Sequence, residues 1–176
     1  MMHKRRTFLL GLGAAAAALA TIPVTAEAAL QALPVPTGKV VLTISGKITN
    51  TNAGTTAVFD MPSLEGIGLT SFTTGTPWDP GKTNFQGVLL DTLMQRVGAH
   101  GKTAVAYALN DYSVELPISD FSQYGTLLAT KMNGKYMPVA DKGPLFVVYP
   151  FDSRASLQRQ TFYGRSVWQL NRLVIA

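Results

Sequence analysis

The side chains in this sequence that could bind or transform a small molecule are hydroxyl, amide, aromatic and cationic groups at predicted turns. The segment Thr73-Thr74-Gly75-Thr76-Pro77-Trp78 supplies hydroxyls, a flexible glycine and an indole, and Asn110-Asp111-Tyr112 joins two alternating segments. Loops held by a rigid scaffold commonly carry binding residues. Each residue also has a structural interpretation as core, turn or solvated charge. We therefore predict a binding site drawn from Thr74, Thr76, Trp78, Asn110, Asp111, Lys142, Arg154, Arg165 and Trp168.

The residue inventory excludes several catalytic chemistries. The 176 residues include no cysteine, which removes disulfides, thiolate nucleophiles, iron–sulfur clusters and cysteine-bound zinc. Of the two histidines, His3 lies in a segment predicted to be cleaved. His100 lies in a polar turn, where a surface position without a function is the simpler interpretation. No nucleophile elbow, His-Glu-x-x-His motif or phosphate-binding loop occurs, and we predict no metal-ligating residues.

Residues 1–28 are predicted to be a cleaved signal peptide of the twin-arginine type. A basic start that includes Arg5-Arg6-Thr7-Phe8-Leu9 precedes an apolar stretch of alanine, glycine and leucine. Ala26-Glu27-Ala28 provides the small residues of a cleavage site. The apolar stretch is shorter than the ~20 residues that cross a bilayer. We expect residues 29–176 to form the mature protein in the periplasm, with no transmembrane segment.

The composition is that of a folded domain of ordinary size. Apolar residues make up 47% of the sequence and charged residues 14%, which is about half the usual fraction. Part of the basic excess lies in the predicted signal peptide, so the mature chain is only mildly cationic. It has no basic stripe that would fit nucleic acid. We predict one domain that binds no nucleic acid.

Hydrophobic periodicity predicts many short strands and one helix with a clear helical period. The helix is expected over 87–98, where Leu89, Leu93 and Val97 recur at helical spacing. Asn133-Gly134 is the strongest hairpin signal in the chain. The remaining segments predict a single, mainly-β domain of the α+β class. Its expected elements are a polar loop over 70–84, a helical turn over 62–66, and strands over 39–48, 57–59, 103–109, 113–116, 124–132, 135–139, 145–149 and 167–175.

Six short motifs occur in an order that resembles a known family. They are Ile44-Ser45-Gly46-Lys47-Ile48, Phe85-Gln86-Gly87-Val88-Leu89-Leu90-Asp91-Thr92-Leu93, Asp111-Tyr112-Ser113-Val114-Glu115-Leu116-Pro117, Leu127-Leu128-Ala129 ahead of Asn133-Gly134-Lys135, Gly143-Pro144-Leu145-Phe146-Val147-Val148-Tyr149-Pro150, and Val167-Trp168-Gln169-Leu170. From about Val40 to Ile175 the chain resembles the molybdopterin-binding domain of the sulfite oxidase superfamily in its short periplasmic form. The resemblance implies a strand-rich α+β fold, a molybdopterin-type cofactor and an oxidoreductase activity.

The resemblance also assigns one residue and shows three departures. Tyr112 matches the tyrosine of the family's Tyr-x-x-x-(Ile/Leu)-Pro motif, which lies beside the metal and substrate, so it is the candidate catalytic residue. The family's metal-ligating cysteine precedes the Gly-Val-x-Leu helix, where residues 70–78 of this chain offer threonine, serine and glycine. The family has a basic residue after Gly-Gly-Pro-Leu and another before the closing tryptophan. Phe146 and Val167 stand at these positions.

Three hypotheses of function are open. The first is a periplasmic molybdopterin-type oxidoreductase with an atypical, cysteine-free pocket that does not oxidise sulfite, in which Arg154 or Arg165 replaces part of the lost positive charge. The second is a non-catalytic module on the same fold, which binds a small ligand or serves a membrane sensor. The third is haem in the vacated cleft. The expected partners are a small anionic ligand or pterin, and a membrane-bound sensor or redox partner.

Overall fold

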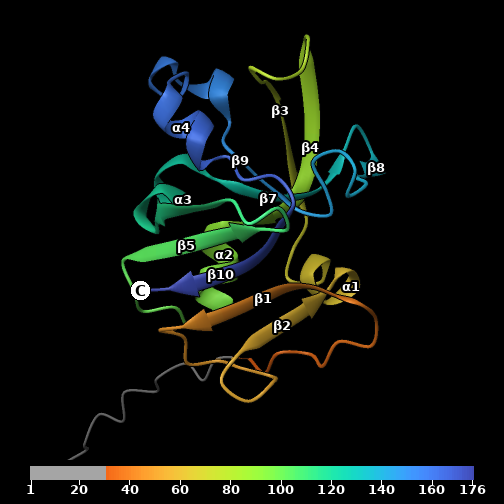
Figure 1. The fold of residues 1–176 in the computed structure, drawn as a ribbon, viewed down its shortest axis with the longest axis vertical. Coiled ribbons are helices and arrows are strands. Elements are labelled where there is room, and N and C mark those ends of the chain that lie inside the picture. Colours follow the sequence, from red (N-terminus) through yellow and green to blue (C-terminus); the bar gives the residue numbers. More distant parts are fainter. Residues whose placement is uncertain (1–30) are drawn as a thin grey trace, which may run out of the picture.

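A computed structural model of the protein describes residues 31–176, so the predicted signal peptide lies outside the described residues. The first of two sheets has the strand order β2-β1-β10-β5-β6, in which β1 and β10 are parallel and the other neighbours are antiparallel (Figure 1). Along β1, Leu42 and Ile44 are buried while their neighbours are half-buried, which is the alternation of a sheet with one covered face. The strands are β1 (Val40–Gly46), β2 (Ala57–Asp60), β5 (Thr103–Ala108), β6 (Ser113–Pro117) and β10 (Leu170–Ile175).

The second sheet carries the long hairpin of β3 and β4, which projects beyond the first sheet in Figure 1. Its order is β3-β4-β7-β8, and β9 also pairs with β7. The predicted hairpin turn at Asn133-Gly134 is confirmed, because both residues adopt the positive φ that this turn requires. The strands are β3 (Thr70–Gly75), β4 (Lys82–Leu89), β7 (Leu127–Met132), β8 (Lys135–Tyr136) and β9 (Phe146–Val148).

The helices are short and lie mostly in the connections between strands. The predicted turn over 62–66 is confirmed as α1, which begins after Asp60 and is closed by a capping box between Asp60 and Ser63. Two α-helices and two 3₁₀ turns were not predicted, because they are too short to carry a helical period. The α-helices are α1 (Met61–Glu65), α2 (Leu90–Arg96), α3 (Ser119–Tyr124) and α4 (Gln160–Arg165), and the 3₁₀ turns are η1 (Phe151–Ser153) and η2 (Ala155–Leu157).

The segment 70–84, which was predicted as a loop, is a β-hairpin instead. Residues Thr70 to Gly75 pair in register with Gly87 to Lys82, which leaves 76–81 as the turn. Threonine is β-branched and favours extended backbone when a partner strand is present. The polar composition therefore concealed two strands, and the prediction of a loop is wrong for most of this segment.

The predicted helix over 87–98 is correct in its centre and wrong at its start. Gly87, Val88 and Leu89 belong to β4 and pair with Ala129, Leu128 and Leu127 of β7, so α2 begins only at Leu90. A Cβ atom on Gly87 would lie 2.0 Å from the Leu128 carbonyl oxygen, so glycine here permits the close approach of two strands.

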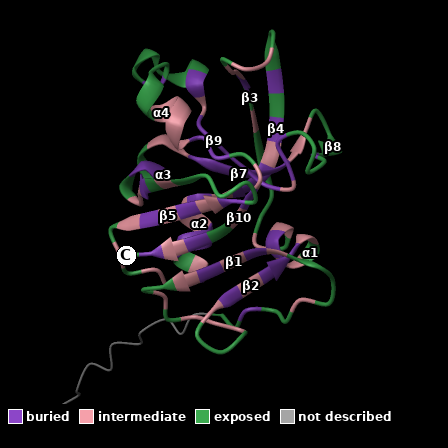
Figure 2. Ribbon diagram, in the orientation of Figure 1, coloured by how far each residue is buried: buried purple, intermediate pink, exposed green. Residues whose placement is uncertain are grey.

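One apolar core joins the two sheets. It is formed by inward residues of both sheets, by α2 and by the segment from Leu145 to Phe151. Figure 2 shows buried residues along the strands and exposed residues in the loops. No helix within residues 31–176 is long and apolar enough to cross a membrane. The strand-rich arrangement confirms a mainly-β domain of the α+β class.

Candidate functional site

Four of the predicted site residues meet in one pocket, which we call the aromatic pocket. The β3–β4 turn supplies Trp78, the β5–β6 turn supplies Asn110 and Tyr112, and the segment before β10 supplies Trp168. The pocket has a volume of about 200 Å³. Its lining is uncharged and consists of Trp78, Asn110, Tyr112, Tyr163, Gly164, Ser166 and Trp168.

Trp78 connects the pocket to the core through edge-to-face contacts. Its ring centroid lies 5.3 Å from that of Trp168 and 5.9 Å from that of Tyr163, at interplanar angles of 83° and 73°. On its other side it packs against Phe146 and Phe151, with centroids 6.0 and 6.1 Å away. Such pairs are worth about 0.5–1.5 kcal/mol each beyond the area that they bury. The indole is therefore a wall of the pocket and a part of the core at once.

Tyr112 closes one side of the pocket. Its hydroxyl donates a hydrogen bond of 2.8 Å to the carbonyl oxygen of Gly164, and its backbone N–H donates to the Asn110 Oδ1 at 3.2 Å. The residue is 46% exposed, so part of its side chain remains open to solvent. Asp111 has a φ of 65°, which turns the chain between these two lining residues, and it does not line the pocket.

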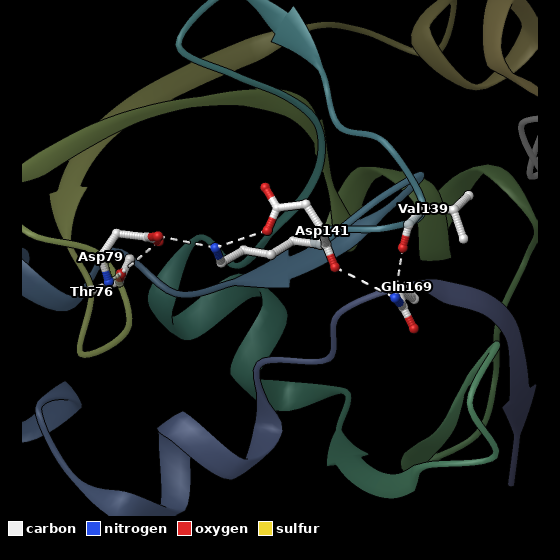
Figure 3. A network of polar contacts seen from close by, with 6 residues as sticks. Thr76, Asp79, Val139, Asp141 and Gln169 are labelled. Carbon is white, nitrogen blue, oxygen red and sulfur yellow. Dashed lines mark hydrogen bonds and ion pairs between the residues drawn. The ribbon is translucent and has the colours of Figure 1, made fainter.

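Lys142 lies beneath Trp168, bound to two carboxylates. Its Nζ donates to Asp79 Oδ1 at 3.0 Å and to Asp141 Oδ1 at 3.3 Å (Figure 3). The same nitrogen lies 5.3 Å from the centroid of the Trp168 ring. Burial acts to lower the pKa of Lys142, but the hydrogen bonds and charges of Asp79 and Asp141 outweigh it and raise the pKa above its ordinary value. Lys142 is therefore a fully paired cation, and it does not line the pocket. We call Asp79, Asp141 and Lys142 the Lys142 cluster.

The two predicted arginines also lie outside the pocket lining. Arg165 donates from Nη1 to Asp120 Oδ2 at 2.8 Å, and the hydroxyl of Tyr149 donates to the same oxygen at 3.0 Å. Burial, followed by the Asp120 charge, raises the pKa of Tyr149, so its hydroxyl stays protonated. Arg154 packs its guanidinium 5.6 Å from the Tyr124 ring centroid. We call Asp120, Tyr149 and Arg165 the Asp120 cluster.

Thr74 and Thr76 shape the β3–β4 turn and do not line the aromatic pocket. The buried Thr74 hydroxyl accepts from the backbone N–H of Asp152 at 3.0 Å. Thr76 donates to Asp79 Oδ2 at 3.2 Å and accepts from the Asp79 backbone N–H at 3.1 Å, which orients the carboxylate that binds Lys142 (Figure 3). Both threonines position other residues.

Three lining residues were missed in the sequence: Tyr163, Gly164 and Ser166. They belong to α4 and to the turn after it, in a segment with no strand alternation and too few residues for a helical period. The only local signal is the aromatic pair Phe162-Tyr163 next to a glycine and an arginine. Within residues 31–176 no group of three or more histidine, cysteine, aspartate or glutamate side chains could hold a metal ion.

Comparison with known proteins identifies the family of the chain. The family model described as the oxidoreductase molybdopterin binding domain matches residues 39–152. No protein of curated function matches the chain at a significant level. The matched residues run from the start of β1 into η1 and include Trp78, Tyr112 and the Lys142 cluster, whereas Trp168 lies beyond them. Because the match covers well over half of the sequence, the chain belongs to the oxidoreductase molybdopterin-binding domain family.

Proposed function

We propose that this chain is a non-catalytic member of its family that binds a small molecule in the aromatic pocket and holds no molybdenum cofactor. The resemblance to the sulfite oxidase superfamily implies a molybdopterin-type cofactor, held by a cysteine thiolate and by cations. The residues of this chain do not fit that group.

The observation that carries the proposal is the packing of the two positions where the family has basic residues. Phe146 and Val167 are both completely buried. The Phe146 ring lies 6.0 Å from Trp78 and 6.2 Å from Trp168, measured between centroids. Apolar side chains that are packed against the pocket wall cannot donate hydrogen bonds to a phosphate. Apolar core side chains therefore occupy the two positions where the family has basic residues.

None of the three cations predicted for the site lines the aromatic pocket, and Arg154 packs against the Tyr124 ring instead. Lys142 is bound to two carboxylates and Arg165 to one, at 2.8–3.3 Å. To bind a phosphate, each would have to leave a partly buried ion pair, and breaking such a pair is costly. No cysteine is present to supply a thiolate, and a threonine hydroxyl is a neutral, hard donor.

The size of the pocket also favours a small ligand. Pockets for drug-sized ligands begin near ~300 Å³, and the aromatic pocket measures about 200 Å³. A pterin that carries a phosphate and a metal is larger than this space. We therefore favour a ligand of a few carbon atoms.

The test is to purify the chain from its native compartment and to measure bound molybdenum by mass spectrometry and bound pterin by fluorescence after oxidation. A cysteine-containing family member, prepared in the same host, is the positive control. We expect less than a tenth of an equivalent of either in this chain, as an order of magnitude, and near-stoichiometric amounts in the control. Stoichiometric pterin in this chain would contradict the proposal and support the oxidoreductase hypothesis.

The proposal includes export of the mature domain to the periplasm through the twin-arginine route. The support is the sequence pattern of residues 1–28, which lie outside the described residues. Replacing Arg5 and Arg6 by lysine keeps the charge and removes the arginine pair, so we expect unprocessed protein in the cytoplasm. Lys4→Arg is the matched control and should leave export intact. Unchanged export of the double variant, seen by fractionation, would exclude this route.

A further inference from the structure

We propose that the ligand of the aromatic pocket is a small organic cation of the quaternary ammonium type. This inference rests on the proposed function and narrows it to one chemical class. It follows from two features of the site: the arrangement of the rings and the charges around them.

The rings form walls at right angles to each other. Trp168 and Tyr163 each meet Trp78 at 73–83°, with centroids 5.3–5.9 Å apart, and the half-exposed Tyr112 ring adds a further wall. The face of an aromatic ring carries negative charge and attracts a cation within about 6 Å of its centroid. Trp168 already shows this contact, because the ammonium of Lys142 lies 5.3 Å from its centroid.

The charges next to the pocket are mainly negative. The Lys142 cluster has two carboxylates and one cation, and therefore a net charge of −1. The Asp120 cluster contributes none, because Arg165 neutralises Asp120. Asp111 adds a carboxylate directly between two lining residues. With no charged side chain in the lining itself, this surplus attracts a cation and repels an anion.

Two of the three hydroxyl groups in the lining are already used within the protein. Tyr112 donates to the Gly164 carbonyl at 2.8 Å, and Ser166 donates to the Phe162 carbonyl at 2.9 Å. The Tyr163 hydroxyl, the indole N–H groups of Trp78 and Trp168 and the Asn110 amide are left to face a ligand, and all but the amide belong to aromatic rings. A sugar needs several hydrogen bonds to replace its water, whereas a quaternary ammonium has no donor or acceptor to satisfy. Binding of the ammonium therefore does not depend on these groups and rests on the ring faces and on the charge around them.

The experiment compares choline with its uncharged isostere, 3,3-dimethylbutan-1-ol, by calorimetry and tryptophan fluorescence on the mature chain. Both titrations use the same ionic strength, set with sodium chloride. We expect saturable binding of choline that is about tenfold tighter than that of the alcohol, the difference that cation–π attraction supplies. Trp168→Leu should weaken choline binding about tenfold, because it removes one wall that is 37% exposed. Tyr136→Leu, at an exposed aromatic residue outside the pocket, is the matched control and should leave the affinity unchanged.

The outcomes separate this inference from the proposed function. Equal binding of choline and the alcohol would overturn the inference and leave a small-molecule pocket in place. No saturable binding of choline would also overturn it. The molybdenum and pterin measurement decides the proposed function independently, since it does not depend on which small molecule binds. If the Trp168→Leu variant does not fold, the comparison of choline with the alcohol on the unmodified chain still tests the inference.

Discussion

The Lys142 cluster and the Asp120 cluster both join an ion pair to aromatic rings, but they have opposite compositions. In the first, one cation lies between two carboxylates, of which Asp79 is 24% and Asp141 44% exposed. In the second, one carboxylate that is 9% exposed serves both a guanidinium and a tyrosine hydroxyl. The first connects the β3–β4 turn to the loop before β9, and the second connects α3 to the residue after β9 and to α4.

The difference shows why the number of basic residues near the pocket does not give its ability to bind an anion. Lys142 and Arg165 were predicted as ligands for an anion, and both belong to closed clusters. Asp141 adjoins Lys142, but Asp79 and Asp120 lie 63 and 45 residues away from their partners in the chain, so local sequence does not reveal these pairs. One cluster leaves a surplus carboxylate near the pocket and the other leaves none. Whether a basic residue can serve a ligand depends on this tertiary pairing.

The largest effect is expected from opening the Asp120 cluster. Asp120→Ala leaves the Arg165 guanidinium and the buried Tyr149 hydroxyl without their acceptor. Removing one partner of a buried pair typically costs 3–5 kcal/mol, and we expect about 3 kcal/mol because Arg165 is partly exposed. Urea unfolding measures this loss.

The matched control for this variant is Asp91→Ala, at a carboxylate that accepts only from Gln95 on the helix surface. Its free energy of unfolding should fall by less than about 1 kcal/mol. Equal losses in the two variants would mean that the Asp120 cluster adds nothing specific to stability.

A smaller effect is expected from opening the Lys142 cluster. Lys142→Met keeps most of the side-chain volume and leaves two carboxylates unpaired, but water reaches both of them. We expect the free energy of unfolding to fall by about 2 kcal/mol. Lys82→Met is the control, because Lys82 is 70% exposed in its ion pair with Asp152 and should contribute less than about 0.5 kcal/mol. A loss as large as that of Asp120→Ala would contradict the ranking of the two clusters.

The strands of the first sheet, the turn between β7 and β8, and the family could be predicted from the sequence, because all three depend on residues that are close together in the chain or on their order along it. Alternation along β1 and the Asn133-Gly134 turn reflect the period of a strand and the φ of two residues. The six motifs occur along the chain in the order of the family. These features need no knowledge of which distant residues meet.

The aromatic pocket could be predicted only in part. Trp78, Asn110, Tyr112 and Trp168 were identified as candidates from their residue types, and the structure brings them together. Tyr163, Gly164 and Ser166 were missed because a short helix carries no periodic signal. The hairpin of β3 and β4 was missed because its threonines are equally common in loops, and only the pairing of the two strands with each other shows that they are extended.

A third carboxylate, Asp60, is held by hydrogen bonds alone and has no cation partner among the described residues. Comparing it with Asp120 shows how much a cation partner adds to the cost of removing a carboxylate. Hydrogen bonds from Ser63, and then from backbone N–H groups of the chain before β1, hold the pKa of Asp60 well below its ordinary value. The unfolded chain therefore takes up this proton at a higher pH than the folded chain does. The stabilisation is complete above the ordinary aspartate pKa of ~4 and is lost as the pH falls towards the folded pKa.

Asp60→Asn should flatten the loss of stability between about pH 5 and pH 2, measured by urea unfolding at each pH. It should destabilise the protein at pH 7 by less than Asp120→Ala does, because no cation is left unpaired. A pH profile identical to that of the unmodified chain would show that Asp60 titrates normally.

The smallest effect is expected at Tyr112, where the catalytic and the binding hypotheses differ most clearly. Tyr112→Phe keeps the ring that walls the pocket and removes one exposed hydrogen bond, to Gly164. The free energy of unfolding should fall by about 1 kcal/mol or less. The affinity for choline should change by less than about threefold, because cation–π attraction depends on the ring face and tolerates the loss of the hydroxyl. A loss of more than tenfold in affinity, with stability unchanged, would instead place the hydroxyl in contact with the ligand. That result would return Tyr112 to the role that the resemblance assigns to it.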